Sequence, residues 1–362
     1  MKTIKINFSG FWNGFAPEKF CVYELLQKHY NVEISDSPDY VFCSVFDHHS
    51  YVNIQQIRIL FSGENYIPDL NLVDYGISVY PLSFLDRHMS FPGLAVSSLD
   101  SFWELQNKKR EYTEDFLKTK TLFANMIASH DSDNGIRTRL FDMLTKYKRV
   151  EAPGELRYNI MHGERVYRHD GSKRELQQKC KFTLCSESTC EGGFITEKIF
   201  EAFCADTIPV YLGSSTVCEH VNKNAFINIA DYDDLQDVVD RIIELDKNDE
   251  KYLEMLRQPI FVRSNYVQEK VNELERFLCN IFDQPLEKAG RRATSFHPKA
   301  YEKIVSLGGQ GYVEEQRDLR KKKAQRQKRK EFWRYLPQRI LLFAVGENRY
   351  KQIKNSFKKN TK

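Results

Sequence analysis

The stretch from Lys181 to Ser214, KFTLCSESTCEGGFITEKIFEAFCADTIPVYLGS, is the most informative part of this chain. It reads as an apolar strand, a polar turn, a helix that begins at Thr-Glu-Lys, and a second short strand that ends in Tyr-Leu-Gly. Gly192 and Gly193 allow the backbone to turn tightly before the helix. A strand, a helix and another strand in this order are typical of a parallel sheet with helices on its faces.

The start of the helix in this stretch is suited to an anion. The first N–H groups of a helix have no partner within it, and the helix dipole places partial positive charge there. Lys198 stands in this first turn, where a cation is disfavoured unless negative charge comes close. The sequence therefore predicts a phosphate-binding helix end that suits a diphosphate.

This block resembles the donor-binding motif of the α1,3-fucosyltransferases, glycosyltransferase family 10, which transfer L-fucose from GDP-fucose. Two upstream stretches resemble other motifs of the family: FSGENYIPDLNLVDY at residues 61–75, and FANMIASH at residues 123–130 followed by Ile136-Arg137. Order and spacing agree from about residue 1 to 285, and residues past about 300 carry no such match.

Strand and helix patterns alternate along the chain, which predicts an α/β fold. The resemblance implies the GT-B architecture, in which two Rossmann-like domains face each other across a cleft. We expect an acceptor-binding domain at 1–112, a donor-binding domain at 113–300 whose last helices pack back toward the first domain, and a basic tail at 301–362. The charged segment at 107–115 is the best linker candidate.

Glu64 is the residue that the resemblance implies as the catalytic base. It follows a predicted strand at 57–61, and Gly63 allows the backbone to turn and present it. Without the resemblance, a glutamate in a Gly-Glu-Asn turn is ordinarily a solvated surface residue. Partial desolvation by bound substrates would raise its pKa and favour its work as a base.

The resemblance implies that Arg137 and Lys198 clamp the diphosphate and that Glu197 is a second carboxylate in contact with the donor. Arginine offers a planar fork that matches phosphate oxygens, and lysine acts as a point charge. The alternatives are a surface arginine, a first-turn lysine, and a role for Glu197 at the helix cap beside Thr196.

The turn and the helix start are also expected to line the donor pocket, through Glu187, Ser188, Gly193, Phe194 and Thr196. The family usually has Asn at the position of Ser188 and Tyr at the position of Phe194, and His130 replaces a common Asn. These departures remove hydrogen-bond partners of the donor. Two alternatives follow: weaker binding of GDP-fucose, or a different donor.

We predict no metal site and no required cofactor, with a divalent cation at most stimulatory. The triplet at 131–133 imitates the metal-binding DxD of another glycosyltransferase fold, but it is short and falls in a predicted loop. The paired His48-His49 reads as an exposed loop, with a sugar contact as the alternative. The eight cysteines are dispersed and mostly in apolar contexts, which indicates buried thiols in a reducing compartment.

Charge is divided unevenly along the chain. Residues 317–362 carry 17 lysines and arginines against three acidic residues, a net charge of +14, so the remainder of this +4 chain carries −10. Pro337 indicates a helix start, and aromatic residues at 332–335 with an apolar run at 340–345 predict a tail that lies on an anionic membrane surface. The alternatives are a disordered solubilising tail and an arm for nucleic acid, which we do not expect as a partner.

The first residues, MKTIKINF, read as a strand rather than a signal peptide. No run approaches the ~20 apolar residues that a membrane-spanning helix needs. We therefore expect a bacterial protein in the cytoplasm, peripheral on the inner face of the cytoplasmic membrane.

The expected function is inverting α1,3-transfer of L-fucose from GDP-fucose to a glycan acceptor that contains N-acetylglucosamine, such as a β-galactosyl-N-acetylglucosamine unit of a Lewis-type lipopolysaccharide or glycoprotein glycan. Transfer of another GDP-linked deoxysugar and an inactive carbohydrate-binding protein remain as alternatives. The sequence does not identify the acceptor.

Overall fold

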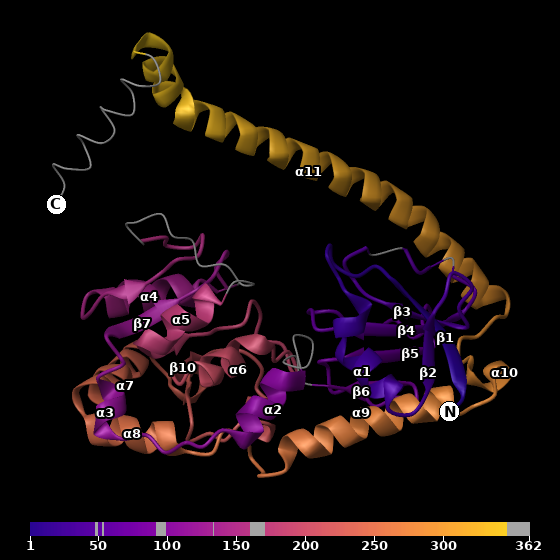
Figure 1. The fold of residues 1–362 in the computed structure, drawn as a ribbon, viewed down its shortest axis with the longest axis horizontal. Helices are drawn as coiled ribbons and strands as arrows, with labels where there is room; N and C mark the ends of the chain where they lie inside the picture. Colours follow the sequence, from indigo (N-terminus) through magenta and orange to yellow (C-terminus); the bar gives the residue numbers. More distant parts are fainter. Residues whose placement is uncertain (48–49, 53, 92–98, 133, 160–170, 346–362) are drawn as a thin grey trace. The chain divides into compact units, whose positions relative to one another are not determined.

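The structure is a computed structural model that describes residues 1–47, 50–52, 54–91, 99–132, 134–159 and 171–345. Its contacts divide the chain into two units, Met1–Pro298 and Lys299–Lys362. The first unit contains two parallel sheets with helices around them (Figure 1). The α/β class predicted from the alternating patterns is confirmed.

The first sheet has six parallel strands in the order β2-β1-β3-β4-β5-β6. Its inner strands β3, β4 and β5 are buried along their whole length, as parallel strands covered on both faces should be. The order reverses between β1 and β3, so the carboxyl ends of these two strands form the topological switch point. The elements are β1 (Thr3–Ser9), η1 (Pro17–Lys19), α1 (Cys21–Gln27), β2 (Asn31–Ile34), β3 (Tyr40–Cys43), β4 (Ile57–Ser62), β5 (Tyr75–Ser78), β6 (His88–Ser90) and α2 (Leu99–Asn107).

The second sheet repeats this topology with five parallel strands in the order β11-β10-β9-β7-β8. Its order reverses between β7 and β9, which gives this sheet a switch point of its own. The elements are α3 (Glu114–Leu117), β7 (Leu122–Met126), α4 (Ile136–Thr145), β8 (Val150–Glu151), α5 (Ser172–Lys179), β9 (Cys180–Leu184), α6 (Glu197–Cys204), β10 (Ile208–Tyr211), η3 (Val217–Glu219), β11 (Ile227–Asn228), η4 (Ile229–Asp231), α7 (Leu235–Lys247) and α8 (Asp249–Arg257).

An aromatic junction joins the two sheets. Phe102 on α2 packs edge to face on Phe200 of α6, with ring centroids 6.4 Å apart. It also packs on Tyr266, the first residue of helix α9 (Tyr266–Phe282), with ring centroids 6.2 Å apart. All three rings are fully buried. The expected linker at 107–115 begins beside this junction, where Lys108 Nζ donates to the Cys204 carbonyl at 2.8 Å. The connection between the sheets is therefore held against the end of α6.

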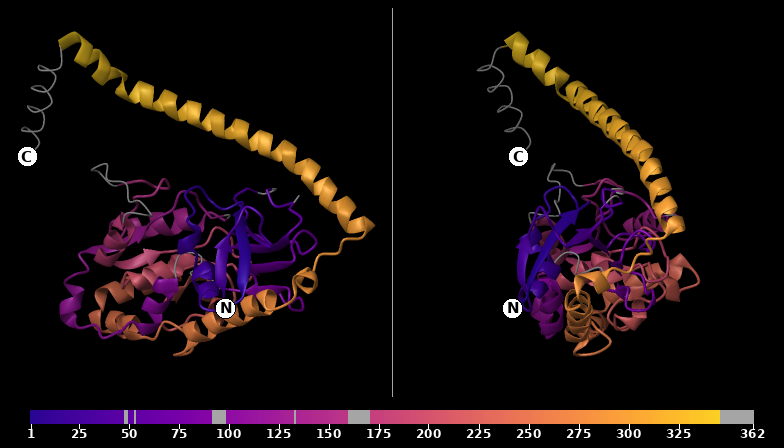
Figure 2. Two further views of the ribbon diagram at one scale, coloured as in Figure 1. Left: turned by 45° about the vertical axis from the view of Figure 1, so that its right-hand side comes forward. Right: turned by 90° about the vertical axis from the view of Figure 1, so that its right-hand side faces the viewer.

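The chain returns to the first sheet through α9 (Tyr266–Phe282) and α10 (Leu286–Ala289). Both views of Figure 2 show α9 in orange alongside the indigo strands of this sheet. Phe282 is buried against Tyr40 of β3, with ring centroids 4.5 Å apart, and its carbonyl accepts a hydrogen bond from Lys2 Nζ at 2.6 Å. The last helices of the first unit, α9 and α10, thus pack on the N-terminal sheet and complete its core.

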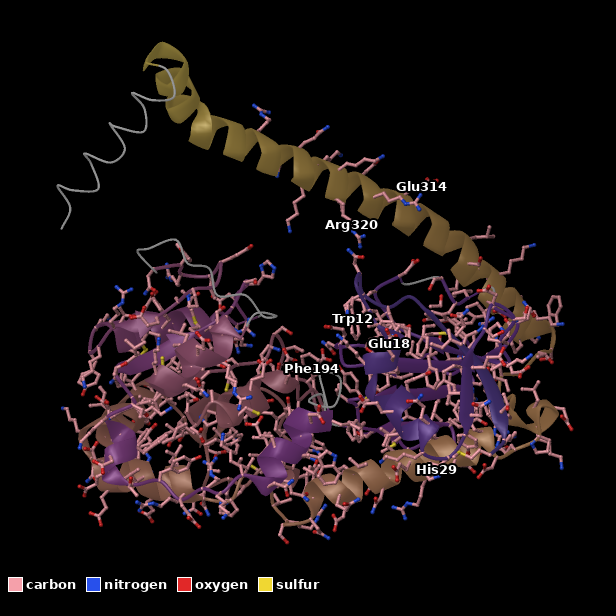
Figure 3. The ribbon with its side chains drawn as sticks, in the orientation of Figure 1. Trp12, Glu18, His29, Phe194, Glu314 and Arg320 are labelled. Atoms are coloured by element: carbon pink, nitrogen blue, oxygen red, sulfur yellow. The ribbon has the colours of Figure 1, made fainter. Side chains whose placement is uncertain are left out.

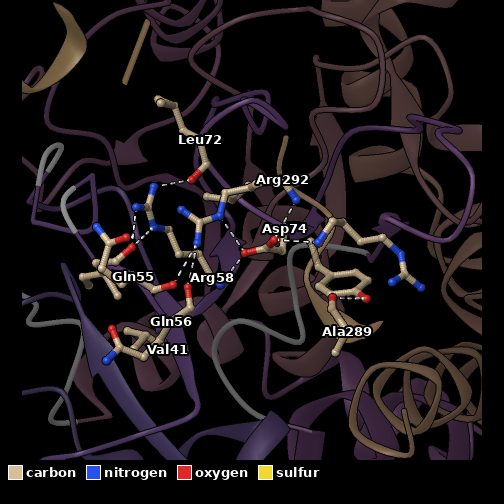
Figure 4. A network of polar contacts seen from close by, with 12 residues as sticks. Val41, Gln55, Gln56, Arg58, Leu72, Asp74, Ala289 and Arg292 are labelled. Carbon is tan, nitrogen blue, oxygen red and sulfur yellow. Dashed lines mark hydrogen bonds and ion pairs between the residues drawn. The ribbon is translucent and has the colours of Figure 1, made fainter. Parts of the chain in front are cut away.

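A buried carboxylate holds this returning segment in place (Figure 4). Asp74, just before β5, accepts hydrogen bonds from the backbone N–H groups of Arg58, Arg291 and Arg292 at 2.7–2.8 Å. The Arg292 side chain adds an ion pair to the same carboxylate at 2.8 Å. Since both oxygens of Asp74 are used, the carboxylate joins β4 to the segment after α10.

The helix α11 (Phe296–Val345) has 50 residues; it begins at the end of the first unit and continues through most of the second. The prediction that a helix starts at Pro337 was wrong, because α11 continues through this residue. The residues ahead of it are mainly Lys, Arg, Gln and Glu, which favour the helix and outweigh the cost of one internal proline. Within the described ranges, no helix is long and apolar enough to cross a membrane.

Asp74→Ala should lower the free energy of unfolding by about 3 kcal/mol, since it leaves the Arg292 guanidinium, whose side chain is only 14% exposed, without its carboxylate. Asp86→Ala is the matched control, because Asp86 pairs with Arg291 while 40% exposed and such a pair is worth under about 1 kcal/mol. Urea denaturation of both variants measures the difference. Equal stability losses would contradict this role for Asp74.

Candidate functional site

The candidate site lies at the carboxyl ends of β7, β9 and β10. These ends are level with one another, because Met126 of β7 pairs with Leu184 of β9, and Leu184 pairs with Val210 of β10. The switch point between β7 and β9 lies at this edge, where α/β sheets bind their ligands. The residues that follow these strands, and the helices α4 and α6, supply the polar groups.

Arg137 spans the switch point. It stands in the first turn of α4 and is 9% exposed. Its guanidinium donates to the carbonyl of His130, which follows β7, at 2.7 Å, and to the carbonyl of Ser186, which follows β9. These contacts fix the plane of the guanidinium between the two strand ends, which is the position for an anion clamp.

Glu187 organises the start of α6. Its carboxylate is 1% exposed and accepts from the backbone N–H of Thr196 at 2.8 Å and from the Thr196 hydroxyl at 2.8–2.9 Å. Lys198 Nζ pairs with the same carboxylate at 2.8 Å and donates to the Thr196 hydroxyl at 2.8 Å. Thr196 is the N-cap residue, but its hydroxyl makes no capping bond to the helix because it is directed to Glu187.

Burial raises the pKa of Glu187, and the ion pair with Lys198 and the hydrogen bonds from Thr196 oppose that rise. The ammonium of Lys198 is therefore what allows a carboxylate to remain ionised in this buried position. Lysine has three N–H donors, and the two contacts above use two of them. The Lys198 side chain is 32% exposed, so the remaining donor can be reached from solvent.

The two cations are anchored on consecutive residues. Arg137 binds the carbonyl of Ser186, and Lys198 binds the carboxylate of Glu187. The start of α6 adds the positive end of its dipole. The resemblance implied Arg137 and Lys198 as one clamp, and in the structure they are anchored on the consecutive residues that follow β9.

Gly193 connects the candidate site to the first sheet. Its φ of +88° is left-handed, and a Cβ built on it would lie 2.2 Å from Pro81 Cδ, so a side chain cannot be accommodated without movement. The Tyr80 hydroxyl donates to the Glu191 carboxylate at 3.1 Å, and Phe194 is buried against Tyr80. The loop after β5 therefore packs on the turn before α6, and the ring of Phe194 serves this contact.

The other predicted residues are exposed or half-buried, and Glu64 belongs to the first sheet rather than the second. Glu64 is exposed, two residues beyond β4, and its backbone N–H binds the Ser62 hydroxyl at 3.2 Å. Ser188 is exposed after Glu187, and Glu197 is half-buried at the first position of α6. The structure records no direct contact from Glu64 to Arg137 or Lys198.

The acidic triplet at 131–133 contributes to α4 through Asp131. Asp131 Oδ1 accepts from the backbone N–H groups of Ser132 at 2.9 Å and Thr138 at 3.3 Å. Burial opposes ionisation here, but the hydrogen bonds from Thr138 and Ser132 prevail and hold the pKa of Asp131 below its usual range. Asp133 and the pair His48-His49 lie outside the described residues.

Within the described ranges, no group of three or more His, Cys, Asp and Glu side chains is arranged to hold a metal ion. A surface hollow of about 450 Å³ lies along α9 and includes His29, Glu273 and Arg276. None of the predicted site residues lines it, so we do not assign it to the site.

The sequence reasoning missed Tyr80, Pro81 and Ser214. The Ser214 hydroxyl follows β10 and accepts the N–H of Gly193 at 2.7 Å, so its place directly after a strand was a usable signal. Tyr80 and Pro81 are more than 100 residues before the turn that they contact, and no local pattern indicates that contact.

Two parallel sheets, each with a switch point, and two cations beyond the strands of the second sheet are the arrangement expected of a GT-B fold. Two family models match the chain: the alpha-(1,3)-fucosyltransferase FucT N-terminal domain over residues 6–96, and the glycosyltransferase family 10 (fucosyltransferase) C-terminal domain over residues 117–300. The second covers half of the chain, and the chain belongs to glycosyltransferase family 10.

Individual relatives are similar over different shares of the chain. The alpha-(1,3)-fucosyltransferase FucT of Helicobacter pylori is 26% identical over an alignment of 292 residues that covers 70% of this chain and 59% of that protein. A putative fucosyltransferase of Acanthamoeba polyphaga mimivirus is 29% identical over 227 residues, 60% of this chain and 36% of that protein. The chain thus spans less than two thirds of the length of these curated relatives.

Solved structures show the same fold. A crystal structure of an alpha1,3-fucosyltransferase aligns with a TM-score of 0.66 and 22% identity over 82% of this chain and 93% of that one. A crystal structure of alpha1,3-fucosyltransferase with GDP-fucose aligns with a TM-score of 0.60 and 23% identity over 77% of this chain and 91% of that one. These likenesses establish the GT-B fold that the sequence predicted.

Lys198→Met should destabilise the protein in a pH-dependent way. Without the ammonium, the pKa of buried Glu187 rises further, while in the unfolded chain it stays near the ordinary value of 4.5. Stability is then lost as pH increases from about 4.5 through the raised pKa, reaching a deficit of about 2 kcal/mol at neutral pH.

Urea denaturation between pH 4.5 and 8 measures this loss for Lys198→Met and for the double variant Glu187→Gln/Lys198→Met. The double variant should not show the extra pH dependence, because it has no carboxylate to ionise at this position. A stability deficit of Lys198→Met that is the same at every pH would contradict the assignment.

Proposed function

We propose that this chain transfers L-fucose from GDP-fucose to a glycan acceptor that contains N-acetylglucosamine, with an α1,3 linkage. The observation that carries this proposal is the pair of cations, Arg137 and Lys198, anchored on the consecutive residues Ser186 and Glu187 at the switch point of the second sheet. A diphosphate needs fixed positive charge, and the two cations together with the positive end of the α6 dipole supply it here.

Family membership and relatives support the choice of sugar and acceptor. One solved structure of the same fold is an alpha1,3-fucosyltransferase with GDP-fucose. The human 4-galactosyl-N-acetylglucosaminide 3-alpha-L-fucosyltransferase 9 is 36% identical over 76 residues, 20% of this chain and 21% of that protein. From these two names we take GDP-fucose as the proposed donor and a galactosyl-N-acetylglucosamine glycan as the proposed acceptor of this chain.

In the proposed reaction, the acceptor oxygen forms a bond to C1 of fucose while the bond from C1 to the diphosphate oxygen breaks. Glu64 takes the proton of the acceptor hydroxyl, and the departing GDP keeps the electron pair. Arg137, Lys198 and the start of α6 stabilise the charge that develops on the diphosphate. Glu197, at the first position of α6, steadies the positive charge on the sugar ring.

Transfer of another GDP-linked deoxysugar is the second candidate, because Ser188 and Phe194 stand where the family usually has Asn and Tyr. Phe194 is 3% exposed and packs against Val79 and Tyr80, so a phenol in its place would need a hydrogen-bond partner within this cluster. A donor competition assay with GDP-fucose and other GDP-sugars distinguishes the two candidates.

The direct test is release of GDP from GDP-fucose across a panel of N-acetylglucosamine-containing acceptors, with the linkage of the product determined by NMR. The proposal expects transfer to O3 of N-acetylglucosamine. Fucose transfer that continues in the presence of a chelator is expected if side chains, rather than a metal ion, hold the diphosphate. Absence of fucose from every acceptor would overturn the proposal.

Glu64→Gln should leave GDP-fucose binding nearly unchanged while transfer falls by roughly 10²–10⁴, the usual contribution of a general base. The substitution keeps the shape of the side chain and removes the proton acceptor. Single-turnover rates and calorimetric titration with GDP-fucose separate the two effects. Turnover within a few-fold of the wild type would show that another group is the base.

We also propose that α11 holds the protein on an anionic membrane surface, peripheral on the cytoplasmic face. Within the described side chains of α11, seven cations between 317 and 329 are exposed: Arg317, Arg320, Lys321, Lys322, Lys323, Arg326 and Arg329. Each basic residue near an anionic surface contributes about 1 kcal/mol. The apolar residues at 332–345 would add area in the interface.

Removal of residues 317–362 should leave transfer to soluble acceptors unchanged and release the protein from vesicles, because both sheets and α9 lie before residue 299. Flotation of the full chain and the truncated chain, with and without anionic lipid, measures binding. Equal flotation of the two forms would remove the anchor proposal, and loss of folding would show that the tail stabilises the first unit.

A further inference from the structure

An exposed aromatic pair, Trp12 and Phe46, lies on the first sheet, with Trp12 labelled in Figure 3. The side chains are 37% and 43% exposed, and their ring centroids are 5.7 Å apart at an angle of 81°. Trp12 also packs on Phe11 and Phe15, whose rings are 4.1 Å apart and stacked. The pair is therefore held rigidly on an aromatic base while part of each ring faces solvent.

The pair lies at the switch point of the first sheet. Trp12 follows β1 and Phe46 follows β3, the two strands between which the strand order reverses. Gly10, at φ +72°, brings the loops after these strands together, since a Cβ built on it would lie 2.6 Å from the Ser44 carbonyl oxygen. The Gly10 carbonyl accepts the N–H of Phe46 at 3.0 Å.

The same edge carries the proposed base. β3 and β4 are parallel neighbours, with Cys43 paired to Leu60. Phe46 stands three residues and Glu64 four residues beyond this pair, and the Ser44 hydroxyl binds the Phe61 carbonyl at 3.0 Å. The aromatic pair and Glu64 therefore extend from adjacent strands at one end of the sheet.

We propose that Trp12 and Phe46 bind the galactosyl ring of a β-galactosyl-N-acetylglucosamine acceptor, next to the N-acetylglucosamine whose hydroxyl reacts at Glu64. This inference rests on the proposed function. Galactose has an axial O4, so one face of its ring presents C–H groups without hydroxyls, and such an apolar face packs on aromatic rings. The rim of the ring keeps its hydroxyls for polar partners, and the exposed Asp47 follows Phe46 directly.

The charge of this edge favours a neutral sugar over the donor. The fixed cations for a diphosphate lie on the second sheet, at Arg137 and Lys198. The aromatic pair and Asp47 offer no positive charge, so they suit an uncharged ring with hydroxyls. We therefore assign the neutral acceptor sugar to the switch point of the first sheet and the diphosphate of the donor to that of the second.

Trp12→Ala and Phe46→Ala test the proposal with two acceptors, a β-galactosyl-N-acetylglucosamine glycoside and the N-acetylglucosamine glycoside that lacks galactose. Each variant should lower kcat/KM for the disaccharide by about tenfold, the effect of losing one well-packed aromatic contact. For the monosaccharide, kcat/KM should change less than twofold. Trp12→Phe should recover most of the loss.

Phe84→Ala is the matched control. Phe84 is 48% exposed in the connection between β5 and β6, but it lies beside Arg87, whose guanidinium binds the carbonyls of Leu70, Val73 and Asp74 ahead of β5. Phe84 therefore lies near the amino ends of the strands, and Phe84→Ala should leave kcat/KM for both acceptors unchanged. Thermal unfolding of every variant shows whether the fold is retained.

Saturation-transfer NMR in the presence of GDP gives a readout that needs no turnover. The wild type should transfer saturation to the H3, H4 and H5 protons of galactose, and Trp12→Ala should not. The inference is overturned if folded Trp12→Ala and Phe46→Ala retain the disaccharide preference and the galactose signals. If the wild type transfers no fucose, the proposed function fails. The saturation-transfer experiment still shows whether Trp12 and Phe46 bind galactose.

Discussion

The buried carboxylate of Glu187 ties the start of α6 to the end of β9, and the remainder of the candidate site depends on this tie. A carboxylate that is 1% exposed is costly unless it is fully hydrogen-bonded and paired. The backbone N–H and hydroxyl of Thr196 and the ammonium of Lys198 satisfy it. The same contacts fix the first turn of α6 and hold Lys198 in the one region of a helix where a cation is unfavourable without an anion.

The two sheets of the first unit share a topology but differ in the chemistry beyond their strands. In each sheet the order reverses between the first strand and the third, and each reversal creates a place for a ligand. The second sheet places an arginine and a lysine there, and the first sheet places aromatic rings and an exposed glutamate. Contact between the loop after β5 and Gly193 couples the two edges, so a change at one can alter the position of the other.

Local patterns were sufficient to predict the strands around 181–214, the helix start at Thr196 and the α/β class, because these follow from residue type over a few positions. The roles of Glu64 and Arg137 came from resemblance, and the structure places them at strand ends without testing their chemistry. The contact of Pro81 with Gly193 could not be predicted, since it joins residues far apart in sequence. The helix through Pro337 shows how favourable neighbours can override one residue that favours a helix start.

We propose that Lys198, held by Glu187, binds the second phosphate of a guanosine diphosphate. Calorimetric titration of GDP and GMP into the wild type and into Lys198→Ala measures it most directly. We expect the wild type to bind GDP at least tenfold more tightly than GMP, and Lys198→Ala to lose most of this difference because a charge-assisted contact to the phosphate is gone. A preference for GDP that is unchanged in folded Lys198→Ala would show that Lys198 does not bind the second phosphate.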